Sequence, residues 1–93
     1  MDTQITIDQK YRFTTDLGQA GATVASGYPI DHFSKDKDEP GKVIFAFKRE
    51  AGLDKVMEGY WIDAITVKPY KYYECLRMIK NRIRQEVYNK QPD

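Results

Sequence analysis

A chain of 93 residues falls within the usual size of one domain and leaves little room for a second core. Hydrophobic residues make up 41% of it and aromatic residues 13%, which excludes an intrinsically disordered protein. The 15 basic and 14 acidic side chains almost cancel, so attraction to nucleic acid or to an anionic membrane has to come from local clusters of charge.

The cysteine content and the first residues predict a cytoplasmic protein. Cys75 is the single cysteine, so the chain cannot form a disulfide within itself. The opening sequence MDTQITIDQK lacks the apolar core of a signal peptide. No apolar stretch approaches the roughly 20 residues that span a bilayer, so we expect no residence in a membrane.

A first helix is predicted from the N-cap at Asp16 to about Gly27. Asp16 is a good N-cap, and Gln19 stands three residues later, where a capping-box side chain returns the hydrogen bond. Apolar residues then follow at helical spacing until about Gly27. Gly18 and Gly21 lie inside this helix, which predicts close packing against a neighbouring element.

Three segments predict β-strands. The first is expected at residues 10–14. The segments YPIDHF and KVIFAFKR flank the polar run SKDKDEPGK and predict an antiparallel hairpin, with the Pro-Gly pair of that run in the turn. Val43, Phe45 and Phe47 share one face by the two-residue alternation of a strand, so we expect them in the core.

Two more helices are predicted in the second half. Helical spacing of apolar residues places a short helix at about residues 50–61. Ile65 and Val67 then alternate in a candidate fourth strand. A long helix is expected from Pro69 to about Asn89. Its apolar stripe consists of Tyr72, Leu76, Ile79, Ile83 and Val87.

Together these segments predict an α+β protein. A small antiparallel sheet of three or four strands is packed by two or three helices, in the order β-α-β-β-α-α with a long C-terminal helix. Residues 10–89 are expected to form this single domain. Residues 1–9 are expected to be an extended N-terminal tail and residues 90–93 a C-terminal tail.

The candidate ligand-binding residues lie mostly on the last helix. Steps of four, three and four residues place a cationic ridge along one flank of the apolar stripe; its members are Tyr73, Arg77, Lys80 and Arg84. Lys71 and Arg82 fall on the opposite flank, and Trp61 and Tyr73 are candidates for stacking on a base. The alternative is an ordinary solvated helix face, with Glu74 and Glu86 as partners of the basic residues.

No catalytic or metal site is predicted. His32 is the only histidine, so no two-histidine metal site exists, and the carboxylates of the polar run alternate with lysines as in a solvated hairpin tip. Cys75 has no histidine nearby in sequence. Phosphate-binding loops, dinucleotide motifs and serine nucleophile motifs are missing, so we expect no enzyme and no cofactor.

Three stretches carry a resemblance to a known family: YRFTTDLGQAGATVASGYPI, KVIFAFKR and YWIDAITVKPYKYYECLRMIKNRI. Over roughly residues 11–87 the chain resembles a family of short phage and prophage proteins described only as a domain of unknown function. It departs from that family in a longer N-terminal tail and in the glycines of the first helix. The resemblance implies origin in a phage or mobile element and a small accessory role, and it singles out Lys80 and Arg82 as basic positions.

Three functions fit this sequence. The first is a non-enzymatic protein that binds an anionic, nucleotide-like ligand and so sequesters a host defence signal in the host cytoplasm. The second is a nucleic-acid-binding accessory protein whose ridge follows a phosphate backbone. The third is a protein-interaction module that inhibits a host enzyme. Homo-oligomerisation is a further expectation, through the last helix or the N-terminal tail.

Overall fold

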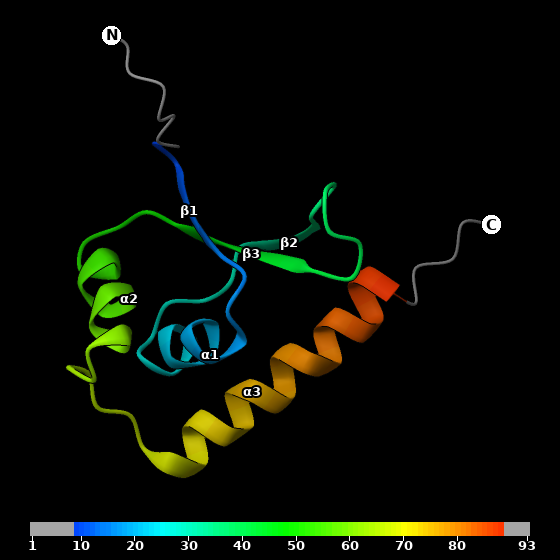
Figure 1. Cartoon of the computed structure of the whole chain (residues 1–93). Coiled ribbons are helices and arrows are strands. Elements are labelled where there is room, and N and C mark those ends of the chain that lie inside the picture. Colours follow the sequence, from blue (N-terminus) through cyan, green and yellow to red (C-terminus); the bar gives the residue numbers. More distant parts are fainter. Residues whose placement is uncertain (1–8, 89–93) are drawn as a thin grey trace, which may run out of the picture.

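A three-stranded antiparallel sheet forms one layer of the protein, and three helices pack below it (Figure 1). The computed structural model describes residues 9–88. The strands are β1 (Tyr11–Thr14), β2 (His32–Lys35) and β3 (Val43–Lys48), and their order in the sheet is β1-β3-β2. The predicted α+β class and the predicted element order are confirmed. The predicted tail residues 1–8 and 90–93 lie outside the described residues.

The hairpin of β2 and β3 forms as predicted, but its first strand begins later in the chain. Ser34 and Lys35, which the prediction placed in the loop, pair with Ile44 and Val43 of β3. The earlier part of the predicted strand contains Pro29, which has no N–H to donate to a sheet and therefore delays the start of regular pairing.

The inner face of the sheet is the hydrophobic core, as predicted. The exposed fractions of Val43, Phe45 and Phe47 are 8%, 2% and 0%. Phe33 of β2 meets Phe45 edge-on, with 5.6 Å between ring centroids. The helices contribute Leu53, Met57 and Ile79 to the same cluster, so the sheet and the helices share one core.

The outer face of the sheet carries an aromatic cluster around a small residue. Ala46 of β3 is 0% exposed although it points away from the helices. It is flanked by Phe13 of β1 and His32 of β2, which pair with it on either side. Tyr11 meets His32 edge-on, with 5.0 Å between ring centroids. Large side chains on both edge strands therefore bury the central alanine.

Helix α1 (Leu17–Ala25) begins at the predicted N-cap, but the capping box is only half formed. The N–H of Gln19 donates to the carboxylate of Asp16 at 2.7 Å. The Gln19 side chain does not return this bond; its Nε2 donates instead to the carbonyl of Met57 at 2.7 Å. The hydroxyl of Thr14 accepts from the N–H of Asp16 at 3.1 Å. The side-chain amide of Gln19 therefore links α1 to the helix that contains Met57.

The glycines of α1 face neighbouring side chains, as predicted. A Cβ atom at Gly21 would lie 2.5 Å from Cδ2 of Leu76, which is well inside van der Waals contact. A Cβ atom at Gly18 would collide with the hydroxyl of Tyr60. The hydroxyl of Tyr72 also donates to the carbonyl of Gly18 at 3.2 Å. The backbone of α1 therefore approaches its neighbours closely because these two positions lack side chains.

Helix α1 and helix α2 (Leu53–Trp61) end in the same backbone motif. After α1, Gly27 has a positive φ of 107°, and the N–H of Tyr28 donates to the carbonyl of Thr23 at 3.2 Å. After α2, Asp63 has a positive φ of 60°, and the N–H of Ala64 donates to the carbonyl of Gly59 at 2.8 Å. Both are Schellman motifs, in which a left-handed residue lets the last carbonyls find donors.

The candidate fourth strand is wrong. Residues 64–68 form no ladder, and among the described residues the sheet has three strands. The Schellman turn at Asp63 directs the chain back across α2, where Ile65 lies against Gly59. Ile65 and Val67 line a small hollow with Tyr60 and therefore anchor a connector instead of pairing in the sheet.

Helix α3 (Pro69–Ile83) is the long C-terminal helix, and it runs diagonally beneath α1 (Figure 1). Pro69 occupies its first turn as predicted. The apolar stripe faces the core, and Ile79 at its middle is 0% exposed. The last turn, η1 (Arg84–Tyr88), widens into a π-helix, which the sequence pattern did not predict. The predicted helix end at Asn89 lies outside the described residues.

A charged seam joins the sheet to α2. Arg12 of β1 contacts the carboxylate of Asp54 at 2.6 Å and that of Glu58 at 3.4 Å. Arg49 contacts the same Asp54 at 3.3 Å. The hydrogen bond from Arg12, together with the charges of Arg12 and Arg49, holds the pKa of Asp54 below its ordinary value.

Candidate ligand-binding groove

The predicted cationic ridge exists as an exposed flank of α3 and η1. Tyr73 is 56% exposed, and the guanidinium of Arg77 lies 5.8 Å from the centroid of its ring. Arg77 also contacts the carboxylate of Glu74 at 3.0 Å. Arg84 donates to the side-chain oxygen of Asn81 at 3.0 Å. Lys80, between Arg77 and Arg84, has no carboxylate partner within the described part of the chain.

Arg82 lies on the other flank of the helix and is engaged in structural contacts. Its guanidinium contacts Glu86 at 2.7 Å and lies 4.7 Å from the centroid of the Phe33 ring. The guanidinium of Arg82 therefore lies over Phe33 of β2 and pairs with a carboxylate of η1. The structure does not bring Arg82 together with the ridge.

Trp61 is exposed, as the sequence predicted, but it belongs to a different element from the ridge. It ends α2, where 60% of it is exposed, and its ring meets Tyr60 edge-on with 5.0 Å between centroids. Its neighbour Ile62 is 74% exposed. Trp61 therefore forms part of a separate apolar corner.

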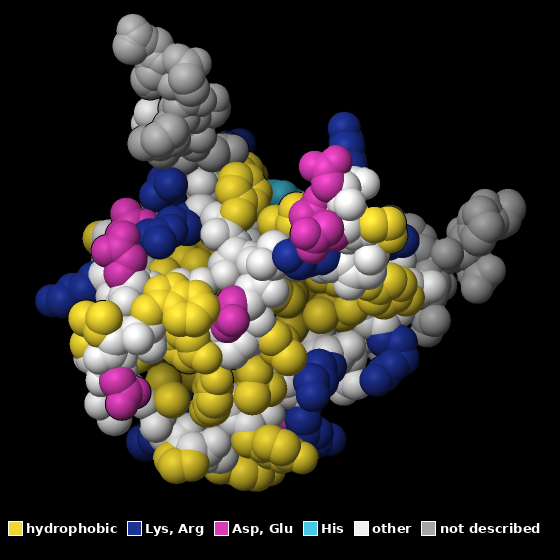
Figure 2. All heavy atoms as spheres, in the orientation of Figure 1, with side chains coloured by type: hydrophobic (Ala, Val, Ile, Leu, Met, Phe, Trp, Pro, Cys, Tyr) yellow, Lys and Arg dark blue, Asp and Glu magenta, His cyan; other side chains and the backbone are white. Residues whose placement is uncertain are grey.

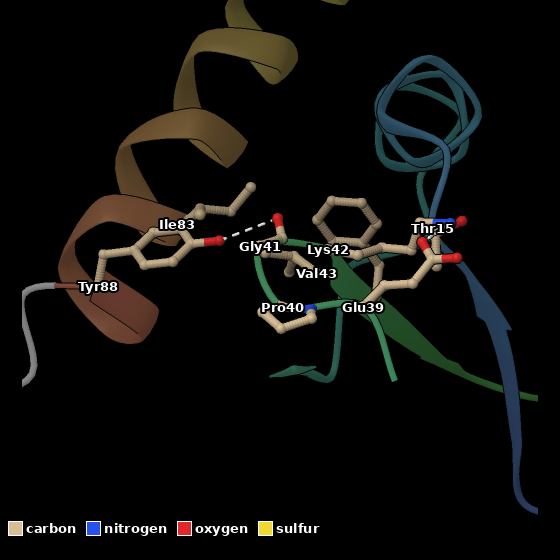
Figure 3. A pocket seen from close by; sticks show the side chains of 9 residues that line it. Thr15, Glu39, Pro40, Gly41, Lys42, Val43, Ile83 and Tyr88 are labelled. Atoms are coloured by element: carbon tan, nitrogen blue, oxygen red, sulfur yellow. Dashed lines mark hydrogen bonds and ion pairs between the residues drawn. The ribbon is translucent and has the colours of Figure 1, made fainter. Parts of the chain in front are cut away.

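A hollow lies where the loop of the hairpin meets the end of the last helix (Figure 3). Its volume is about 490 Å³, within the range of small-molecule sites, and it is open to solvent. The hydroxyl of Tyr88 crosses one end and donates to the carbonyl of Gly41 at 3.1 Å. The lining residues are Thr15, Glu39, Pro40, Gly41, Lys42, Val43, Phe45, Ile83 and Tyr88.

The groove has an apolar floor and a polar rim. Val43, Phe45 and Ile83 supply the floor, and all three come from the predicted core. On the rim, the ammonium of Lys42 contacts the carboxylate of Glu39 at 2.7 Å. The hydrogen bond and charge of Glu39 raise the pKa of Lys42. The same carboxylate neutralises the Lys42 ammonium, which therefore attracts a second anion less strongly. A flat apolar group therefore fits the floor, and Lys42 alone is a weak anchor for an anion.

None of the ridge residues lines the groove, but the ridge runs close to it along α3. Lys80 precedes Ile83 by three residues, so it lies one helical turn away on nearly the same side of α3. Arg84 follows Ile83 directly. Figure 2 shows the Lys and Arg side chains, in dark blue, along α3 below an apolar area at the hairpin. The groove therefore has an apolar floor, and the cationic side chains of the ridge lie near it on the same helix.

Sequence reasoning missed the groove because its wall comes from a segment that was interpreted as a solvated tip. Pro40, Gly41 and Lys42 belong to that segment, and Tyr88 was not singled out. One signal was present in the sequence, namely the glycine at position 41. The structure shows it with a φ of 96°, and its carbonyl accepts the hydrogen bond from Tyr88.

The described residues offer neither a metal cluster nor a membrane-spanning segment. Within residues 9–88, no three His, Cys, Asp or Glu side chains gather closely enough to hold a metal ion. None of the helices there has the length and apolarity needed to cross a bilayer.

Comparison with models of known families, with curated protein sequences and with solved structures gives no match. The resemblance to short phage proteins thus stays a prediction from the quoted stretches.

Proposed function

We propose that this protein is a non-enzymatic binding protein for a small, anionic, nucleotide-like ligand. The supporting observation is the apolar groove with the cationic ridge near it on α3, where Lys80 has no carboxylate partner among residues 9–88. A flat base fits the floor of Val43, Phe45 and Ile83, and its phosphate faces Lys80 and Arg84. In a phage or mobile element, such a protein sequesters a host signal nucleotide in the host cytoplasm.

The charges around the groove favour a small ligand over a nucleic acid. From Tyr73 to Arg84 the ridge is about 16 Å long at the rise of an α-helix, which covers only a few phosphates. Glu39 lies on the rim of the groove, and Asp36 and Asp38 precede it in the same hairpin loop. These carboxylates alternate with Lys35, Lys37 and Lys42, so the loop offers a longer strand no net positive charge to bind.

Isothermal titration calorimetry with linear and cyclic nucleotides tests the proposal. The wild-type protein is compared with the double variant Arg77→Ala/Lys80→Ala and with Lys71→Ala as a matched control, because Lys71 is an exposed cation on the opposite flank of α3. We expect the double variant to bind at least about tenfold more weakly and the control to bind as the wild type does. Equal loss in both variants contradicts a specific site.

The same titrations distinguish the alternative functions. Single-stranded DNA that binds better than any nucleotide, with affinity falling steeply as salt is added, supports a nucleic-acid-binding protein instead. Native mass spectrometry of the protein purified from phage-infected cells adds a direct observation of a retained ligand. A host enzyme that co-purifies with the wild type and equally with the Arg77/Lys80 variant supports an inhibitor of that enzyme.

A further inference from the structure

The small hollow at Ile65 and Val67 lies at the start of α3, whereas the groove lies at the end of the last helix (Figure 1). Its volume is about 170 Å³, and a protein cavity of roughly 150 Å³ holds benzene. The hollow is therefore too small for a nucleotide but has room for a group of about six heavy atoms. The lining residues are Ala22, Tyr60, Asp63, Ile65, Val67 and Tyr72.

The two aromatic rings in the wall of the small hollow are held in place. The hydroxyl of Tyr72 donates to the carbonyl of Gly18 at 3.2 Å, and the ring of Tyr60 meets that of Trp61 edge-on. Burial and the neighbouring Tyr60 hydroxyl raise the pKa of Tyr72, so this phenol is neutral at pH 7. Walls that are already fixed bind an alkyl chain with little loss of conformational entropy.

Among the described residues that line the small hollow, Asp63 is the only charged one. Its carboxylate has neither an ion pair nor a hydrogen bond within residues 9–88. It directly follows the C-cap residue of α2, where the helix dipole is also negative, and the last turn of α2 carries no basic residue. A cation in the hollow therefore relieves a local excess of negative charge.

We propose that the small hollow binds an alkylammonium group, carried either by a free small amine or by a lysine side chain of another protein. The alkyl chain lies on Ile65 and Val67, and the ammonium meets the carboxylate of Asp63. The tyrosine rings favour the same charge, because a cation is attracted to the face of an aromatic ring. This site is independent of the proposed nucleotide site, since it shares no lining residue with the groove.

NMR titration of the isotope-labelled full chain with pentylammonium and with pentanol tests the proposal. The two probes have the same number of heavy atoms and differ in charge. We expect pentylammonium to shift the amide signals of residues 63–67 with a millimolar Kd, and to bind at least about fivefold more tightly than pentanol. Equal affinities of the two probes, or an absence of shifts at these residues, overturn the proposal.

Asp63→Asn should remove the preference for the charged probe. Asparagine, like aspartate, tolerates the left-handed φ of 60° at this position, so the turn after α2 is kept while the charge is lost. The matched control Asp38→Asn makes the same change at the hairpin loop and should leave both affinities unchanged. A preference for pentylammonium that survives in Asp63→Asn contradicts the role of this carboxylate.

A second variant tests the hollow itself. Val67→Phe fills it with a larger side chain, and both probes should lose binding. Its thermal unfolding curve should remain that of a folded protein, because Val67 is only half-buried and lies outside the core cluster. Shifts at residues 63–67 that Val67→Phe leaves unchanged place the probe elsewhere and overturn the proposal.

A blocked leucine-lysine-leucine tripeptide distinguishes the two sources of the ammonium. Trp61 and Ile62, which directly precede Asp63, are 60% and 74% exposed, and the leucines of a peptide reach them whereas a free amine does not. Tighter binding of the tripeptide than of pentylammonium, weakened by Ile62→Ser, assigns the ammonium to a protein partner. Weaker binding assigns it to a free amine. A tripeptide with glutamine in place of lysine that binds equally well overturns the proposal.

Discussion

Two seams join the layers of this protein, and they rely on different forces. Between α1 and α3 the contact is apolar and close, because Gly21 leaves space that Leu76 fills. Between β1 and α2 the outer contact is electrostatic, with Arg12 against Asp54 at the surface. The Asp54 side chain is 58% exposed, so water weakens this attraction. We therefore expect the exposed ion pairs of the charged seam to contribute less to the free energy of unfolding than the close packing of Leu76 on Gly21.

The largest effect is expected from opening the apolar core beside α3. Ile79→Ala removes buried atoms from a residue that is 0% exposed and should lower the free energy of unfolding by about 3 kcal/mol. Urea denaturation measures this loss. Ile62→Ala is the matched control, because Ile62 is 74% exposed and its loss should stay within about 0.5 kcal/mol. Similar losses in the two variants contradict the placement of Ile79 in the core.

Filling the glycine contact should have the next largest effect. Gly21→Ala forces a Cβ atom against Leu76 and should lower the free energy of unfolding by about 1 to 3 kcal/mol, although alanine is the better helix former. The double variant Gly21→Ala/Leu76→Ala removes the clash, so its loss should be smaller than the sum of the two single losses. Additive losses argue against a direct contact.

Breaking the charged seam should give a small effect that depends on pH. Arg12→Met keeps most of the apolar stem but removes the charge, and should lower the free energy of unfolding at pH 7 by less than about 1 kcal/mol. Because Arg12 lowers the pKa of Asp54 in the folded state, this stabilisation is complete above the ordinary carboxyl pKa and is lost as the pH falls through the lowered value.

Urea denaturation of the wild type and of Arg12→Met across a pH series measures this dependence. The two curves should converge once the pH falls below the lowered pKa of Asp54, where this carboxyl is protonated in both proteins. A difference that persists at that pH assigns the contribution of Arg12 to packing rather than to charge.

The smallest effect is expected at the rim of the same seam. Glu58 accepts from Arg12 at 3.4 Å, and its side chain is 70% exposed. Glu58→Gln should therefore change the free energy of unfolding by no more than about 0.5 kcal/mol, and added salt should not change that result. A loss as large as that of Gly21→Ala would reverse the ranking of the two seams.

Local signals in the sequence located most of the elements but not all of their ends. Gly27 marks the end of α1 because only glycine adopts its conformation at no cost, and this end was predicted. Asp63 adopts the same left-handed conformation without such a signal, and the prediction therefore continued the chain into a strand at Ile65. The π-helix after Ile83 has no sequence signal of its own, since its apolar spacing continues that of α3.

The candidate site was predictable only in part, because its halves are far apart in the chain. Helical spacing revealed Arg77, Lys80 and Arg84 as neighbours on one helix. No local pattern shows that a hairpin loop packs against η1, since this contact depends on the tertiary fold. For the same reason, the partner of Gln19 was predicted within its own helix but lies on α2.

The hydrogen bond from Tyr88 to the carbonyl of Gly41 also bears on the order of folding during synthesis. The hairpin and α1 come from the first half of the chain, but the core that they share with Met57 and Ile79 also needs the second half. Ile83 and Tyr88 close the groove from the last turns of the described chain. The core and the binding surface are therefore both completed only once the segment up to Tyr88 has been translated.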